Sequence, residues 1–152
     1  PFTALKAHEE TGGKIIASGK GSTLTDVDGN EFLDAMAGLW CVNLGYGNQR
    51  LGAAIADQVT RLSYYHSFSG MSTDLAVQLS EKIISLAPKN MAKVFFGNSG
   101  SDANDTNAKI IWFYNNAMGK LEKKKIISRL RGYHGVTVLS GGLTGLKNLH
   151  EG

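Results

Sequence analysis

The sequence has very little cysteine: Cys41 is the only one among 152 residues. A single cysteine excludes an internal disulfide and a zinc site made of several cysteines. No apolar run is long enough to cross a bilayer as a helix, and the first residues show no secretory signal. We therefore expect a cytoplasmic protein with no membrane partner.

A strong excess of one charge is also lacking. The net charge is +3, and the basic residues are scattered apart from three lysines at 123–125. No basic patch carries aromatic residues between its charges, so nucleic acid is not an expected partner. With 42% hydrophobic and 19% charged residues, the composition is typical of a folded globular protein.

Several ligand-binding motifs are missing as well. The phosphate-binding pattern G-x-x-x-x-G-K-[ST] does not occur, and the dinucleotide pattern G-x-G-x-x-G follows neither of the strands predicted below. The four histidines have no metal-ligand spacing, so no metal site is predicted.

What is present is a strand, a small-residue turn and a helix that ends near Met118. Residues 94–96 are apolar and β-prone, which is typical of a short buried strand. Ser99 or Ser101 can cap the helix that follows, and Gly100 lets a ligand approach the turn closely. The N–H groups and positive dipole end of this helix suit a phosphate. The alternative is an ordinary strand-to-helix turn that binds no ligand.

A second strand, predicted over residues 125–129, completes a strand–helix–strand unit. Such a unit predicts an α/β fold with a mostly parallel sheet covered by helices. The loops at 97–101 and 131–135 leave the carboxyl ends of the two strands, where open α/β sheets bind ligands. The second loop carries Tyr133 and His134 between glycines, which suits stacking against a flat ligand.

Other elements are predicted from local signals. Apolar residues at helical spacing predict helices, and the Asp28-Gly29 pair between two β-prone runs predicts a hairpin turn. The predicted elements are a weak helix over 1–12, strands over 15–36, and helices over 51–62 and 73–86.

A serine hydrolase is a weaker alternative. Residues 97–101 nearly match the hydrolase turn G-x-S-x-G, but Ser101 replaces the last glycine. His134 would be the nearest candidate base.

Five short segments follow one another along the chain: residues 25–30 (TDVDGN), 37–43 (AGLWCVN), 45–47 (GYG), 99–105 (SGSDAND) and 132–135 (GYHG). Together they resemble the class III (ω-) aminotransferases, and within them the amine–pyruvate and ω-amino acid–pyruvate transaminases. The resemblance covers essentially the whole chain. It implies pyridoxal 5'-phosphate as the cofactor and the fold-type I architecture, with an α+β segment at the amino terminus.

The resemblance also implies cofactor-binding residues. Ser99, Gly100 and Ser101 match the segment that binds the cofactor phosphate. Tyr133 matches the aromatic residue that stacks on the pyridine ring and borders the substrate, and His134 follows it in the same loop. Asp102 stands where a glutamate is common, and the charge is retained.

Four further residues match the substrate pocket of this family: Phe2, Leu39, Trp40 and Phe68. Phe68 matches an aromatic residue contributed across the interface of a homodimer with shared active sites. From the residues alone Trp40 would be assigned to the core, because large aromatic side chains are mostly buried. The resemblance instead makes it part of the pocket wall.

No catalytic residue is assigned within this chain. The Schiff-base lysine of the family, and the aspartate that keeps the pyridine nitrogen protonated, are expected downstream of Gly152. We therefore expect an N-terminal portion of a longer enzyme, with residues 1–50 in the small domain and 51–152 opening the large cofactor domain. The 152 residues alone are expected to be inactive and poorly stable.

The predicted activity is transfer of an amino group from an amine or ω-amino acid to a keto acid such as pyruvate. Two alternatives stay open. One is another fold-type I pyridoxal-phosphate enzyme: a racemase, mutase or decarboxylase. The other is a non-catalytic piece of this fold that only binds.

Overall fold

The computed structural model describes residues 4–151. Their contacts form two compact units, which we call the N-terminal unit (described residues up to Leu79) and the C-terminal unit (from Ser80). The boundary between the units falls within a helix. The division into domains at residue 50 stays a prediction, because it concerns the architecture of a longer chain.

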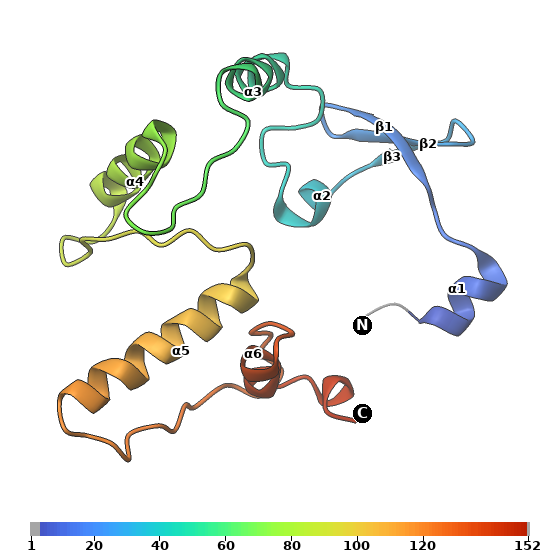
Figure 1. The fold of residues 1–152 in the computed structure, drawn as a ribbon. Helices are drawn as coiled ribbons and strands as arrows, with labels where there is room; N and C mark the ends of the chain where they lie inside the picture. Colours follow the sequence, from blue (N-terminus) through green and yellow to red (C-terminus); the bar gives the residue numbers. More distant parts are fainter. Residues whose placement is uncertain (1–3, 152) are drawn as a thin grey trace. The chain divides into compact units, whose positions relative to one another are not determined.

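The N-terminal unit begins with helix α1 (Leu5–Thr11) and a three-stranded antiparallel sheet in the order β1-β2-β3 (Figure 1). The strands are β1 (Ile16–Lys20), β2 (Thr23–Asp26) and β3 (Glu31–Leu33). The predicted hairpin turn at Asp28-Gly29 is confirmed between β2 and β3.

Asp26 holds this hairpin turn together. Its Oδ1 accepts the N–H groups of Asp28 (3.0 Å) and Asn30 (2.8 Å). The side-chain amide of Asn30 also donates to the carboxylate and is the main reason that the pKa of Asp26 lies below its ordinary value.

Two helices follow: α3 (Gln49–Arg61) and α4 (Asp74–Leu86). Asn48 Oδ1 accepts the N–H of Leu51 at 3.0 Å, and Thr73 Oγ1 accepts that of Ala76 at 3.2 Å, so both helices begin with a side-chain cap. The predicted helices over 51–62 and 73–86 are confirmed.

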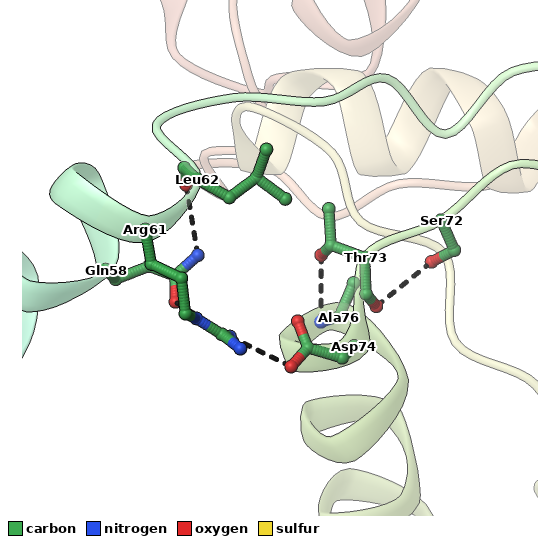
Figure 2. Close-up of polar contacts among 7 residues, drawn as sticks. All are labelled: Gln58, Arg61, Leu62, Ser72, Thr73, Asp74 and Ala76. Atoms are coloured by element: carbon green, nitrogen blue, oxygen red, sulfur yellow. Dashed lines mark hydrogen bonds and ion pairs between the residues drawn. The ribbon is translucent and has the colours of Figure 1, made fainter.

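An exposed ion pair closes the loop between α3 and α4. Figure 2 shows the Arg61 guanidinium directed at the Asp74 carboxylate, with Nη2 and Oδ2 2.9 Å apart. Gln58 accepts from Arg61 at 3.1 Å and donates to the carbonyl oxygen of Leu62 at 3.0 Å. The exposed aromatic residue Phe68 lies in the loop that this pair closes.

The C-terminal unit is built around the long helix α5 (Gly100–Ala117). A short helix α6 (Val138–Leu143) and a 3-10 turn η1 (Lys147–Leu149) follow it (Figure 1). Trp112 on α5 donates its indole N–H to the carbonyl oxygen of Lys124 at 2.9 Å, which ties the returning chain to the helix. The predicted helix ending near Met118 is confirmed.

Two predicted strands are wrong. Residues 94–96 and 125–129 follow irregular paths, and the parallel bridge between Leu130 and Gly145 is the one pairing near them. A strand needs a partner to accept its ladder of hydrogen bonds, and no described segment pairs with either run. Their apolar side chains are accordingly uncovered: Phe95 is 69% and Ile127 97% exposed.

Candidate functional site

The start of α5 is organised by a reciprocal pair of caps. Ser99 Oγ accepts the N–H of Asp102 at 3.1 Å, and Asp102 Oδ2 accepts the N–H of Asn98 at 3.1 Å. Of the two predicted candidates, Ser99 and Ser101, Ser99 is therefore the helix cap. The aspartate that replaces the usual glutamate still completes the pair.

Two backbone donors at this helix start are unused. The N–H groups of Gly100 and Ser101 meet no acceptor within residues 4–151, whereas that of Ala103 bonds to the carbonyl oxygen of Ser99 at 3.0 Å. A Cβ atom at Gly100 would meet nothing within 4 Å, so the turn is open on that side. Two free amides at the positive end of a helix of 18 residues form an anion-binding geometry.

Ser101 connects this helix start to the second loop. Its Oγ accepts the N–H of Val136 at 3.1 Å. Because the oxygen acts as the acceptor, the hydroxyl proton of Ser101 is available to a ligand. The loop that carries Tyr133 and His134 is thus joined directly to the first turn of α5.

Asn104 and Thr144 hold the backbone of His134 from both sides. Asn104 Nδ2 donates to the His134 carbonyl oxygen at 2.7 Å, and the His134 N–H donates to Thr144 Oγ1 at 2.8 Å. Thr144 is buried, and its hydroxyl lies 2.9 Å from the carbonyl oxygen of Gly135. Neither residue was predicted, although Ser101 and Asn104 are three positions apart and so share a helix face.

Asp105 joins α5 to α6. Its Oδ1 accepts the Thr137 hydroxyl at 2.7 Å and the Ser140 N–H at 3.1 Å. The Ser140 hydroxyl lies 2.6 Å from Thr137 Oγ1 and is the donor there, because Thr137 already gives its proton to Asp105. A side chain of one helix therefore caps the next.

Gly135 sits where these groups meet. Its φ is +129°, which disfavours any residue with a side chain, and a Cβ atom would lie 2.5 Å from Ser101 Oγ and closer still to Ser140 Oγ. The close approach of the loop to α5 thus requires glycine.

The two predicted ring residues of the loop differ in exposure. Tyr133 is about half exposed, whereas His134 Nε2 is buried and has no hydrogen-bond partner in the described part of the chain. A buried, unpaired ring nitrogen is unusual and calls for a missing partner. A Cβ atom at Gly132 would lie 3.0 Å from this nitrogen, so it faces the backbone of its own loop, and the anion-binding part of the site is the pair of free amides at Gly100 and Ser101.

The predicted substrate residues belong to the N-terminal unit. Leu39, Trp40 and Phe68 are 62%, 72% and 78% exposed. Phe2 lies outside the described residues. Their role in binding the substrate stays a prediction.

Leu39 and Trp40 lie in a left-handed turn that the sequence did not reveal. In α2 (Ala37–Trp40) the φ angles of the four residues are +47°, +58°, +61° and +69°. Three of the four carry side chains, and each left-handed residue of that kind costs roughly 1–2 kcal/mol. Strain of this kind gathers at functional sites and persists where neighbouring groups enforce it.

Asp34 is the main enforcing group. Its carboxylate accepts the N–H groups of Met36 (3.0 Å) and Gly38 (2.7 Å) and the hydroxyl of Tyr46 (2.7 Å). The Tyr46 hydroxyl, followed by the two N–H groups, holds the pKa of Asp34 below its ordinary value, and the same bond raises the pKa of Tyr46.

Two other kinds of site find no support in residues 4–151. No hydrogen bond joins the His134 ring to a serine hydroxyl, so the nucleophile–base pair of a serine hydrolase is not formed. No group of three potential metal ligands occurs there. Within the same range, no helix is both long enough and apolar enough for a membrane span.

Comparison with known proteins gives consistent matches. The family model described as aminotransferase class-III matches residues 6–152. A diaminobutyrate–2-oxoglutarate transaminase of Halomonas elongata is 51% identical over 145 residues, which are 95% of this chain and 31% of that protein. A gamma aminobutyrate transaminase of Solanum lycopersicum is 46% identical over 99% of this chain and 29% of its own length.

Comparison with solved structures also matches the chain to transaminases. The crystal structure of the omega transaminase from Pseudomonas jessenii in complex with PMP matches with a TM-score of 0.96 at 49% identity, over 100% of this chain and 34% of that one. The predicted fold-type I architecture is therefore confirmed, as a part of that fold. The chain spans about a third of the length of the curated relatives it matches.

Proposed function

Because the chain belongs to the class III aminotransferases, a pyridoxal-phosphate-dependent family, we propose that it serves transfer of an amino group from an amine or ω-amino acid to a keto acid. Relatives named for diaminobutyrate and γ-aminobutyrate support donors of this kind. They also favour transamination over racemase, mutase or decarboxylase activity. One of them is named for 2-oxoglutarate, which makes it an acceptor to test beside pyruvate.

The observation that carries this proposal is the pair of free amides at Gly100 and Ser101, next to the loop of Tyr133 and His134. These amides and the Ser101 hydroxyl would bind the cofactor phosphate. The Ser99 hydroxyl accepts from Asp102 and so keeps its own proton for the same phosphate. When bound, pyridoxal phosphate supplies the electron sink for amino-group transfer.

The second loop would position the ring of the cofactor. Tyr133 would stack on it, with His134 beside it in the same loop. Asn104 and Thr144 keep this loop in place through the backbone of His134. Among residues 4–151 we assign binding and orienting roles and no catalytic lysine.

The substrate side of the site is proposed from the family. Leu39 and Trp40 would line the pocket, and Phe68 would reach the neighbouring active site of a homodimer. A cytoplasmic location, a small-domain role for residues 1–50 and a cofactor-domain role for residues 51–152 complete the proposal.

The test is an aminotransferase assay of the complete polypeptide that contains this sequence. It is loaded with pyridoxal phosphate and given γ-aminobutyrate, diaminobutyrate or an aromatic amine, with pyruvate or 2-oxoglutarate as acceptor. We expect one molecule of the amino acid derived from the keto-acid acceptor to form for each molecule of donor consumed. Ser101→Ala should weaken binding of both pyridoxal phosphate and inorganic phosphate, whereas Ser85→Ala on α4 should not. Cofactor binding without amino acid formation from any pair would contradict the proposal.

A further inference from the structure

The left-handed turn of α2 is the longest run of positive φ angles within residues 4–151, and the proposed binding roles do not explain it. We propose that Asp34 and Tyr46 are positioning residues that hold this turn and thereby present Leu39 and Trp40 to the amino donor. The inference rests on the proposed function, because it assumes that these two side chains contact the donor.

Asp34 and Tyr46 are both tied to the turn between β1 and β2. The N–H of Asp34 donates to the carbonyl oxygen of Ser22 at 2.8 Å. Tyr46 and Gly21 exchange two backbone hydrogen bonds, of 2.8 and 3.0 Å. The residues that begin and end the segment 34–46 are therefore anchored on adjacent residues of one rigid hairpin.

The bond between the two side chains then closes the segment. Tyr46 donates its hydroxyl to Asp34 Oδ2 at 2.7 Å, and the same oxygen accepts the N–H of Gly38 inside the turn at 2.7 Å. Asp34 Oδ1 accepts the N–H of Met36 at the entrance of the turn. One carboxylate thus connects the anchored residue Tyr46 to the strained backbone.

The ring of Tyr46 also fits between two glycines. A Cβ atom at Gly19 would lie 2.7 Å from Cγ of Tyr46, and one at Gly38 would lie 2.8 Å from the Tyr46 hydroxyl. The Tyr46 ring and hydroxyl therefore occupy the space that side chains at positions 19 and 38 would need. Leu39 and Trp40 are left on the outside, where both remain largely exposed.

This arrangement holds the backbone from which the side chains of Leu39 and Trp40 project. Donors with an apolar or aromatic substituent gain most from a preformed apolar wall, because ordering that wall on binding would cost affinity. A small donor such as alanine makes few contacts there. Loss of the hydrogen bond between Tyr46 and Asp34 should therefore weaken binding of large apolar donors selectively.

The first test follows Trp40 itself. Trp40 and Trp112 are the two tryptophans of residues 1–152, so in the complete polypeptide Trp112→Phe, with any tryptophan outside these residues also changed to phenylalanine, leaves Trp40 as the fluorescent reporter. In this background Tyr46→Phe removes one hydroxyl and keeps the ring. We expect lower fluorescence anisotropy and stronger acrylamide quenching of Trp40. Unchanged values in both Tyr46→Phe and Asp34→Asn would overturn the inference.

The second test measures amino transfer by the complete, cofactor-loaded polypeptide. Tyr46→Phe should raise KM for an aromatic amine by roughly 3- to 10-fold, less than for direct loss of a hydrogen bond to a charged group, because this bond acts on the donor only through the turn. We expect little change in kcat or in KM for alanine. Asp34→Asn and the double variant should behave alike, because both lose the shared bond. Tyr114→Phe, on α5, is the matched control.

The outcomes separate the two proposals. If the wild-type polypeptide transfers no amino group, the proposed function fails. The anisotropy of Trp40 then still shows whether Asp34 and Tyr46 hold the turn. If the wild type is active and Tyr46→Phe lowers kcat equally for all donors, the positioning role is wrong.

Discussion

At the scale of single residues, the candidate cofactor site depends on Gly135, a position where no residue larger than glycine fits. Gly135 brings the second loop against Ser101 and Ser140, and its φ of +129° lies outside the range that other residues favour. The sequence singled out this loop because glycines flank Tyr133 and His134. It does not show which glycine is essential, because that depends on where the fold places the hydroxyl oxygens of Ser101 and Ser140.

Gly135→Ala should therefore loosen the C-terminal unit. The added methyl group overlaps two hydroxyl oxygens and requires an unfavourable φ, so we expect a loss of roughly 1–3 kcal/mol in unfolding free energy. Chemical denaturation measures the loss, and hydrogen exchange should show faster exchange of the Val136 amide.

Gly142→Ala is the matched control for this change. Its Cβ atom would meet nothing within 4 Å, and it lies inside helix α6, where alanine is the better helix former. A control variant as damaging as Gly135→Ala would mean that crowding at residue 135 is not the cause.

At the scale of elements, local signals in the sequence are sufficient to predict the helices and the hairpin. The Asp28-Gly29 turn and the caps at Asn48, Thr73 and Ser99 act within four residues, so the sequence displays them directly. The strands at 94–96 and 125–129 were wrong because pairing is not a local property. The left-handed turn was missed because Asp34 and Tyr46, twelve residues apart, impose it.

The junction between α5 and α6 gives a prediction at this scale. Asp105→Ala removes the acceptor for the Ser140 N–H and the Thr137 hydroxyl, so α6 should fray and the unit should lose roughly 0.5–2 kcal/mol, as for loss of a helix cap. Amide exchange over residues 138–143 reports the fraying. Asp105→Asn keeps an acceptor oxygen and should retain most of the protection; equal damage by both variants would contradict a capping role.

At the scale of the whole molecule, we expect the N-terminal unit to lose stability in acid. The pKa values of Asp26, Asp34 and Asp74 all lie below the ordinary value of 3.8, chiefly because Asn30, Tyr46 and Arg61 donate hydrogen bonds to them. A lowered pKa in the folded state means that the carboxylate stabilises the fold above about pH 4. This contribution is lost as the pH falls through the lowered pKa.

We therefore expect the sheet β1–β3 and the turn at 37–40 to open as the pH drops below about 4. Amide exchange of the hairpin residues and the fluorescence of Trp40, measured from pH 6 to pH 2, follow the change. Asp34→Asn should make the Trp40 signal nearly independent of pH in this range. A signal in that variant that still follows the wild-type curve would show that another group controls the turn.

The two segments that lack a strand partner affect how the chain behaves in solution. Within residues 4–151, residues 94–96 and 125–129 pair with no strand, and they carry uncovered apolar side chains such as Phe95 and Ile127. Open edges of this kind are templates for intermolecular β-pairing. The isolated 152-residue polypeptide should therefore aggregate through these segments, and a lysine introduced at Ile127 should keep it dispersed for longer.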